Sequence, residues 1–267
     1  MHPWLLYTDT LRLPTYFTML MVGFALATFV LRREALRDGA APRQTMDAAL
    51  WAVPAAIVGA RAAHVLLEEP AFYWQHPWSA FSPAGGWVFY GGAVGGLLAI
   101  VAFARHRGLD AWALLDRFAV ATPFGLVFGR LGCLGGGCCF GQPADFPLGR
   151  PVPWAIRYYH RGTLPDALLA VPVHAAPLYA IGLALLLFVG LSTWRARQRV
   201  AGEAFLAFLL FYGIGRSILE IFRADAERGV YLGGWLSTSQ ALGLASAVVA
   251  FVLWRIRVAR CIRSSST

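Results

Sequence analysis

The stretch Pro177–Trp194, "PLYAIGLALLLFVGLSTW", contains eighteen residues and no charge. A helix that crosses the hydrocarbon core of a bilayer needs about 17–25 such residues. Of the 267 residues in the chain, 58% are hydrophobic and 14% are charged. Soluble domains average about 25% charged residues, so the composition indicates an integral membrane protein.

Six further apolar segments share this character. With the first, the predicted spans are 14–31, 48–67, 86–104, 113–128, 177–194, 203–222 and 236–254. Nothing in the composition indicates a second, soluble domain. We therefore expect residues 1–267 to form a single all-α polytopic membrane domain with seven transmembrane helices.

Thirteen arginines follow alternate spans in short links. They are Arg32, Arg33, Arg37, Arg43, Arg105, Arg107, Arg195, Arg197, Arg199, Arg255, Arg257, Arg260 and Arg263. Because cytoplasmic links carry the excess of positive charge, we expect a periplasmic amino terminus and a cytoplasmic carboxyl terminus. The net charge of +9 then anchors the chain in the membrane. No basic run alternates with aromatic residues, so nucleic acid is not an expected partner.

Two links on the periplasmic side are long. Residues 68–85 contain five aromatic side chains, which predicts an arm lying in the membrane interface. Residues 141–176 are rich in proline and arginine and are predicted to form a small periplasmic head.

Ionisable residues inside apolar segments indicate an interior cavity, because each costs a few kcal/mol unless it is paired or hydrated. They occur as two stripes at helical spacing and one single charge: Arg61, His64 and Glu68; Arg216, Glu220 and Arg223; and Arg130. We expect His64 and Glu68 to pair with each other. The four arginines meet few carboxylates, chiefly Glu220, so a lipid phosphate bound by guanidinium groups would balance their charge. The alternative is that these charges only pair with one another and hold the helices together.

The stretch 128–143, "FGRLGCLGGGCCFGQP", is predicted to form a flexible loop after the fourth span. Its glycines at 132, 135, 136 and 137 would let backbone N–H groups approach the phosphate. Three interpretations of Cys133, Cys138 and Cys139 remain open: buried residues without chemistry, a disulfide from Cys133 to one of the others, or a thiolate near Arg130. The Cys-x4-Cys-Cys spacing lacks the pairs typical of zinc sites, even with His174 as a fourth ligand. We therefore expect no metal and no other cofactor.

Several motifs in the same order resemble those of the prolipoprotein diacylglyceryl transferase family, between about Pro14 and Trp254. They are "VGARAAHVL", "GWVFYGGAVGG", "GRLGCLGGGCCFGQP", "VHAAPLY" and "YGIGRSILEIFR". The family consists of seven-span enzymes of the bacterial inner membrane. The resemblance implies transfer of diacylglycerol from phosphatidylglycerol to the lipobox cysteine of a prolipoprotein, with release of glycerol-1-phosphate. The alternatives are a paralogue with a different acceptor, or a membrane thiol–disulfide oxidoreductase or redox sensor that uses the three cysteines.

The resemblance also implies site residues. The catalytic set is Arg130, Arg216, Tyr90, Cys138 and Glu220, and the substrate-binding set is Arg61, Cys133, Gly136, Gly137, Gly141, His174, Tyr179, Tyr212 and Arg223. The chain departs from the family where Tyr90 replaces a histidine, Cys133 an asparagine and Cys138 a glutamate. Pro177 and Ala180 likewise replace a glutamine and a glutamate. We choose Cys138 as the reactive thiol because it stands at the position of the glutamate.

Overall fold

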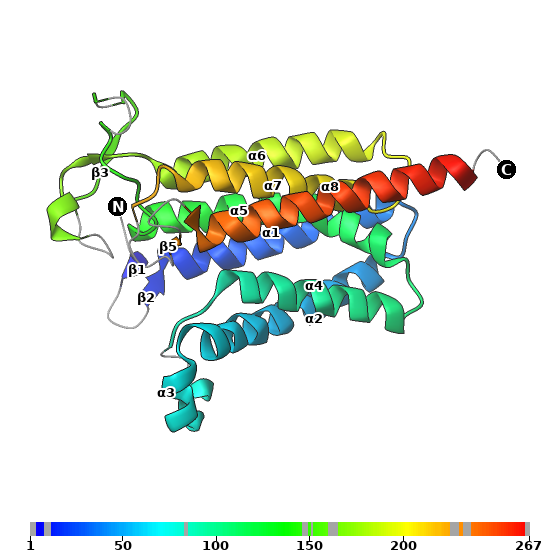
Figure 1. Ribbon diagram of the computed structural model, residues 1–267, viewed down its shortest axis with the longest axis horizontal. Helices are drawn as coiled ribbons and strands as arrows, with labels where there is room; N and C mark the ends of the chain where they lie inside the picture. Colours follow the sequence, from blue (N-terminus) through cyan, green and yellow to red (C-terminus); the bar gives the residue numbers. More distant parts are fainter. Residues whose placement is uncertain are drawn as a thin grey trace. The chain divides into compact units, whose positions relative to one another are not determined.

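The computed structural model describes residues 4–7, 12–82, 85–145, 149–150, 152–159, 165–224, 230–231 and 236–264. Most of these residues are helical, and each predicted apolar segment lies mainly in one long helix (Figure 1). The long helices are α1 (Thr15–Arg37), α2 (Pro42–Ala63), α4 (Phe89–His106), α5 (Ala111–Gly136), α6 (Ala176–Arg195), α7 (Glu203–Glu220) and α8 (Thr238–Ser264).

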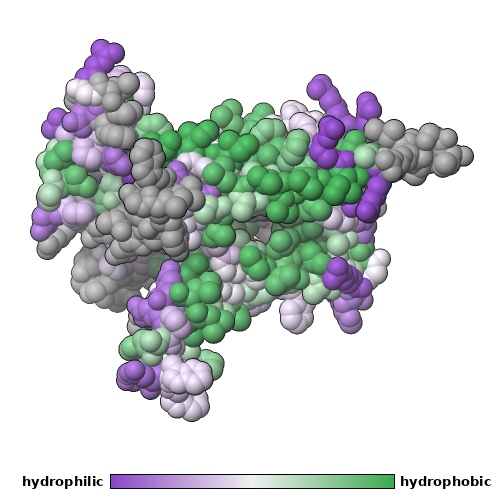
Figure 2. Space-filling view, in the orientation of Figure 1, coloured by the Kyte–Doolittle hydropathy of each residue, from purple (hydrophilic) through white to green (hydrophobic). Residues whose placement is uncertain are grey.

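Six of the described helices are long and apolar enough to cross a membrane. They are α1, α2 with its π-helical continuation η1 (His64–Glu68), α4, α5, α6 and α8. On the face seen in Figure 2, apolar side chains cover the middle of α6 and α8, and polar side chains gather near the helix ends. The protein is therefore a mostly helical, multi-pass membrane protein. Helix α7 has a similar length but contains Glu203, Arg216 and Glu220, so the seven-span arrangement stays a prediction.

The chain forms two compact units, a large unit of residues 1–30 and 118–267 and a small unit of residues 31–117. In the large unit, α7 packs against both α6 and α8. A Cβ atom added at Gly213 of α7 would lie 3.2 Å from the Ser246 Oγ of α8. Glycine thus lets the two backbones approach closely, as is common between membrane helices.

In the small unit, α2 and α4 pack through glycines. A Cβ atom at Gly59 would lie 3.1 Å from the Cα of Gly95. Helix α3 (Pro70–Gln75) and the 3₁₀ helix η2 (Pro77–Phe81) follow η1. They expose four large aromatic side chains, Phe72, Trp74, Trp78 and Phe81. This exposure is what the predicted interfacial arm requires, while its periplasmic location stays a prediction.

Short antiparallel strand pairs complete the described chain. They are β1 (Trp4–Tyr7) with β2 (Arg12–Pro14), β3 (Ile156–Arg157) with β4 (Pro172–Val173), and β5 (Val230–Tyr231) with β6 (Leu236–Ser237). Within residues 141–176 there is also a 3₁₀ turn, η3 (Asp166–Leu168). Phe140, Tyr158 and Val173 form a small buried cluster there. This cluster fixes the chain that leaves α5 against the chain that enters α6.

Candidate active site

The end of α5 differs from the sequence prediction. The helix continues to Gly136, so Arg130 and Cys133 lie on a helix and not in a flexible loop. Gly137 then adopts a left-handed backbone (φ 69°), and the Cys138 N–H donates to the Cys133 carbonyl oxygen at 3.1 Å. This is the hydrogen-bond pattern of a Schellman cap, in which the two bonded residues lie close together. The cap alone therefore brings Cys133 and Cys138 side by side.

The glycines in the last turns of α5 serve helix packing. A Cβ atom at Gly135 would lie 2.6 Å from Thr15 Cγ2, and one at Gly132 would lie 3.1 Å from the Tyr16 carbonyl oxygen. The start of α1 thus packs directly on this part of α5. Because both glycines lie inside the helix, their N–H groups belong to its backbone hydrogen bonds. The expectation that these two N–H groups approach a phosphate is wrong.

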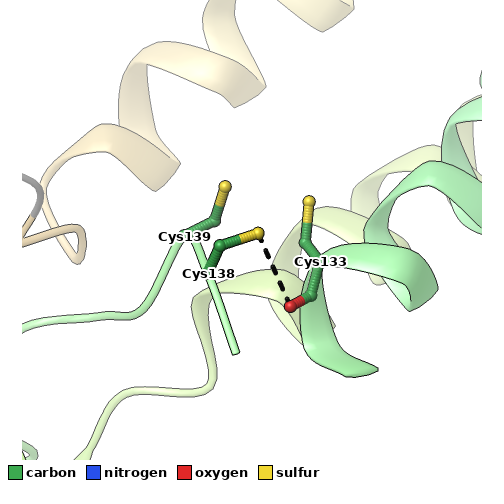
Figure 3. Close-up of side chains that lie close together, drawn as sticks. All are labelled: Cys133, Cys138 and Cys139. Atoms are coloured by element: carbon green, nitrogen blue, oxygen red, sulfur yellow. Dashed lines mark hydrogen bonds between the residues drawn. The ribbon is translucent and has the colours of Figure 1, made fainter. Parts of the chain in front are cut away.

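Three thiols gather beside the end of α5 (Figure 3). The Sγ atoms of Cys133, Cys138 and Cys139 all lie within 4.8 Å of one another. Cys133 is buried and the other two are half-buried, and none of the four cysteines, all of which the structure describes, forms a disulfide. The Cys138 thiol donates to the Cys133 carbonyl oxygen at 3.7 Å. Cys139 has a left-handed backbone (φ 59°), which is uncommon for a residue with a Cβ atom.

The thiols beyond the helix differ in acidity. Hydrogen bonds with Cys133 and Cys139, together with burial, raise the pKa of the Cys138 thiol. Hydrogen bonds from Cys133 and Cys138 lower the pKa of the Cys139 thiol, with a further contribution from the guanidinium groups of Arg223 and Arg130. A thiolate is the reactive form of cysteine. The role of Cys138 as the reactive thiol stays a prediction.

A small pocket adjoins Cys139. Its lining residues are Arg130, Cys139, Ala176, Pro177, Ala180, Arg216, Leu219 and Arg223. Arg216 forms an ion pair with Glu220, one turn further along α7, and both side chains are largely buried. Among the residues that the structure describes, no carboxylate lies within ion-pair distance of Arg130. Three arginine side chains line this pocket, and guanidinium N–H groups donate hydrogen bonds to phosphate oxygens.

The position of Arg223 differs from the prediction. Helix α7 ends at Glu220, so Arg223 does not continue the helical face of Arg216. Instead, Arg223 and Gly141 form an antiparallel bridge, and the Gln142 N–H donates to the Phe222 carbonyl oxygen at 2.9 Å. The segment after α7 is thereby paired with the segment after α5. This pairing brings Arg223 and Cys139 to the same pocket.

Gly141 is essential to that pairing for a steric reason. A Cβ atom there would lie 2.6 Å from the His174 Cβ and 2.9 Å from the Phe222 carbonyl oxygen. His174 is buried, and its Nδ1 lies 2.9 Å from the Tyr179 hydroxyl oxygen. Both rings pack against Phe222. These contacts hold the His174 and Tyr179 rings in place against Phe222. Direct substrate binding by the two residues stays a prediction.

Two tyrosines lie near Arg130, and sequence reasoning found only Tyr212. Tyr212 stacks on Phe208, and both Tyr212 and Tyr16 are close enough to interact electrostatically with Arg130. Tyr16 also lies near all three thiols of the cluster. The glycines of α5 indicate that some helix packs closely there, but the sequence does not say which one. Tyr16 could therefore be found only in the structure.

The remaining predicted residues lie in the small unit. Arg61 donates three hydrogen bonds, to the carbonyl oxygens of Ala80, Ser79 and Gly86 at 2.9, 2.8 and 3.1 Å. Its guanidinium also lies over the Tyr73 ring. These contacts fasten Ser79, Ala80 and Gly86 to α2. Lipid binding by Arg61 stays a prediction.

The small unit also contains His64, Glu68 and Tyr90. His64 and Glu68 form the expected pair, and the Gly86 N–H donates to His64 Nε2. Tyr90 lies in the first turn of α4, with its ring edge-on to that of Phe89. Its catalytic role stays a prediction.

Fold and pocket together define a class: a multi-pass membrane protein with a small arginine-lined pocket. Comparison with known proteins narrows this class. The sequence profile of the family described as "Prolipoprotein diacylglyceryl transferase" matches residues 3–256. The chain belongs to this family.

Individual relatives agree with that assignment. The chain is 31% identical to the phosphatidylglycerol–prolipoprotein diacylglyceryl transferase of Bordetella avium, over 92% of this chain and 91% of that protein. It is 33% identical to the enzyme of the same name from Methylibium petroleiphilum, over 90% and 89% of the two chains. For the one from Geobacter sulfurreducens, the identity is 35% over 85% and 84%.

Proposed function

We propose that this protein transfers the diacylglyceryl group of phosphatidylglycerol to the thiol of a prolipoprotein's lipobox cysteine. Family membership and the names of the relatives support the reaction. The observation that carries the proposal is the pocket with Arg130, Arg216 and Arg223 in its lining. A phospholipid headgroup is the phosphate that a membrane itself supplies, and guanidinium groups bind phosphate oxygens with paired hydrogen bonds.

The charge change of the reaction fits this pocket. The lipid phosphodiester carries one negative charge, and the leaving glycerol-1-phosphate carries two. Arginines that are already in place stabilise the charge that develops in the transition state, and they do so more strongly where water is excluded. Arg130 and Arg216 project from two helices, and the ion pair with Glu220 holds Arg216 in position. We assign the binding of the phosphate to the three arginines and the orientation of Arg216 to Glu220.

The departures from the family lie on the acceptor side of the reaction. Tyr90, Cys133 and Cys138 stand where the family has polar residues near the nucleophile, while the arginines of the phosphate site are kept. A thiol–disulfide oxidoreductase is not favoured, because thiol exchange has no use for a phosphate pocket. The names of the relatives support the usual acceptor, the lipobox thiol of a prolipoprotein.

The proposed membrane arrangement follows from the distribution of arginine. Residues 1–267 form one membrane domain of seven spans in the bacterial inner membrane, with α7 as the sixth. The amino terminus, the arm at 68–85 and the head at 141–176 lie in the periplasm, and the carboxyl terminus lies in the cytoplasm. Arginine-rich links after alternate spans support this orientation.

Complementation tests the proposed reaction in cells. A bacterial strain depleted of its own transferase should regain growth and lipidated lipoproteins when this chain is expressed. Arg216→Lys should fail to restore them at equal expression, because an ammonium cannot reproduce two parallel hydrogen bonds to phosphate. Arg107→Lys is the matched control, since Arg107 is exposed beyond the end of α4. Rescue by the Arg216 variant as complete as by the control would refute the role of the pocket.

A further inference from the structure

The geometry of the three thiols fits a metal ion. In a tetrahedral thiolate site the metal–sulfur distance is about 2.3 Å, which places the sulfur atoms about 3.8 Å apart. The Sγ atoms of Cys133, Cys138 and Cys139 all lie within 4.8 Å of one another. Side-chain rotations that move each sulfur by less than about 1 Å would therefore complete three corners of a tetrahedron. The Cys-x4-Cys-Cys sequence lacks the paired cysteines typical of zinc sites. The fold nevertheless brings the three Sγ atoms close together.

The convergence of the third thiol requires an unusual backbone. The Schellman cap accounts for Cys133 and Cys138, since it joins them by a hydrogen bond. Neighbouring side chains in extended chain point to opposite sides, so Cys139 would normally point away from Cys138. Cys139 instead has a left-handed backbone. Its Sγ lies close to those of Cys133 and Cys138 (Figure 3). A left-handed conformation is unfavourable for a residue with a Cβ atom, and such residues are concentrated at functional sites.

The charges around the cluster match a metal–thiolate complex. Three thiolates and one divalent ion carry a net charge of minus one. Arg130 and Arg223 share the pocket with Cys139 and supply positive charge beside that complex. Thiolate ligands select soft or borderline ions, among which Zn²⁺ performs no redox chemistry and accepts four ligands. Cys138 and Cys139 are half-buried, so a fourth ligand can reach the site from the pocket.

We infer that Cys133, Cys138 and Cys139 bind one Zn²⁺ through three thiolates, and that the open fourth position takes the acceptor thiol of the proposed reaction. The second half of this inference rests on the proposed function. Zinc sites with three protein ligands and one open position are typical of catalysis. A thiol that binds such an ion loses its proton, so the site would supply the acceptor as a thiolate.

The acceptor thiol releases its proton to solvent on binding, and its sulfur attacks the diacylglycerol carbon that is bonded to the phosphate oxygen. The C–S bond forms while the C–O bond breaks, and the electron pair leaves with the phosphate oxygen as glycerol-1-phosphate. The neutral thioether then leaves the fourth position because it is a weaker ligand than a thiolate. Activation of the acceptor thiol by zinc would thus replace the function of the family residues whose positions are taken here by Tyr90, Cys133 and Cys138.

Cobalt binding tests the site without any measurement of activity. Full-length protein, reduced and then freed of reductant in phosphatidylglycerol nanodiscs, is titrated with Co²⁺. We expect one equivalent to bind, with a thiolate-to-cobalt charge-transfer band and the visible spectrum of a tetrahedral complex. Single serine substitutions at Cys133, Cys138 and Cys139 should each weaken binding by at least ~100-fold, whereas Cys261→Ser, on α8, should not. Absence of the band, or its persistence in the triple variant, overturns the metal site.

A thiol peptide tests the fourth position. Addition of a lipobox peptide should shift the visible spectrum of the cobalt protein, and the same peptide with serine in place of cysteine should not. Identical spectra with both peptides overturn the assignment of the open position. Transfer by the metal-free protein at the rate of the zinc-loaded one would overturn the inference while leaving the proposed function intact. Normal cobalt spectra without any transfer from phosphatidylglycerol would instead refute the proposed function alone.

Discussion

Arg130→Lys should reduce kcat/KM for diacylglyceryl transfer by about 30-fold. Arg130 lies near the end of α5 and lines the pocket with Arg216 and Arg223. Lysine keeps the charge but gives up one of two hydrogen bonds to the phosphate, and a hydrogen bond to a charged group is worth about 1.5–3 kcal/mol. A loss of about 2 kcal/mol corresponds to a factor of about 30. The loss should fall mainly on kcat, because the phosphate gains charge only as the C–O bond breaks.

The assay is the initial rate of peptide lipidation in nanodiscs over a range of phosphatidylglycerol contents. Arg107→Lys should retain the wild-type rate, and the thermal unfolding of both variants should match that of the wild type. A kcat/KM for Arg130→Lys within threefold of the wild-type value would refute the assignment of Arg130 to the phosphate. An effect confined to unfolding temperature would show that Arg130 serves stability alone.

Three further predictions test the remaining parts of the structure. Gly141→Ala should destabilise the folded state by roughly 1–3 kcal/mol, because its Cβ would be forced against His174, and thermal unfolding in detergent would reveal this. Arg61→Gln should lower the unfolding temperature, because the charged hydrogen bonds to three carbonyl groups are lost, at a cost of about 2–4 kcal/mol in total. The rate of transfer per folded molecule should stay within a few-fold of the wild-type rate. A loss of transfer without a loss of stability would instead support lipid binding by Arg61. Reporter fusions should be cytoplasmic after Arg199 and periplasmic near Pro165; a cytoplasmic reporter at Pro165 would overturn the proposed orientation.

The helices could be predicted from the sequence because lipid imposes a strong pattern. A spanning helix must satisfy all its backbone groups internally and present apolar side chains, and both demands appear as long apolar runs. The ends of helices were predicted less well. Helix α5 extends eight residues beyond the predicted end at Phe128, because glycines that signal a loop in water here mediate packing on α1. Gly137, the last of the three glycines before Cys138, has the left-handed backbone of the Schellman cap that ends α5.

The arginines of the site could be predicted because charges are rare inside apolar segments. Their arrangement could not, since Arg223 reaches the pocket through a backbone bridge to Gly141 and not through helical spacing. The hydrogen-bond partners of Arg61 were also beyond the sequence, because they are carbonyl groups that no side-chain pattern reveals. The cluster of thiols depends on the left-handed backbone of Cys139, which sequence reasoning does not assign to cysteine.

Mass spectrometry of the products is the most direct test of the central claim. Purified protein in nanodiscs is given phosphatidylglycerol with a deuterated diacylglycerol moiety and a lipobox peptide. We expect a peptide whose cysteine carries the deuterated diacylglyceryl group in thioether linkage, with one glycerol-1-phosphate released for each modified peptide. Unmodified peptide alongside intact phosphatidylglycerol, or a peptide altered only by disulfide exchange, would contradict it.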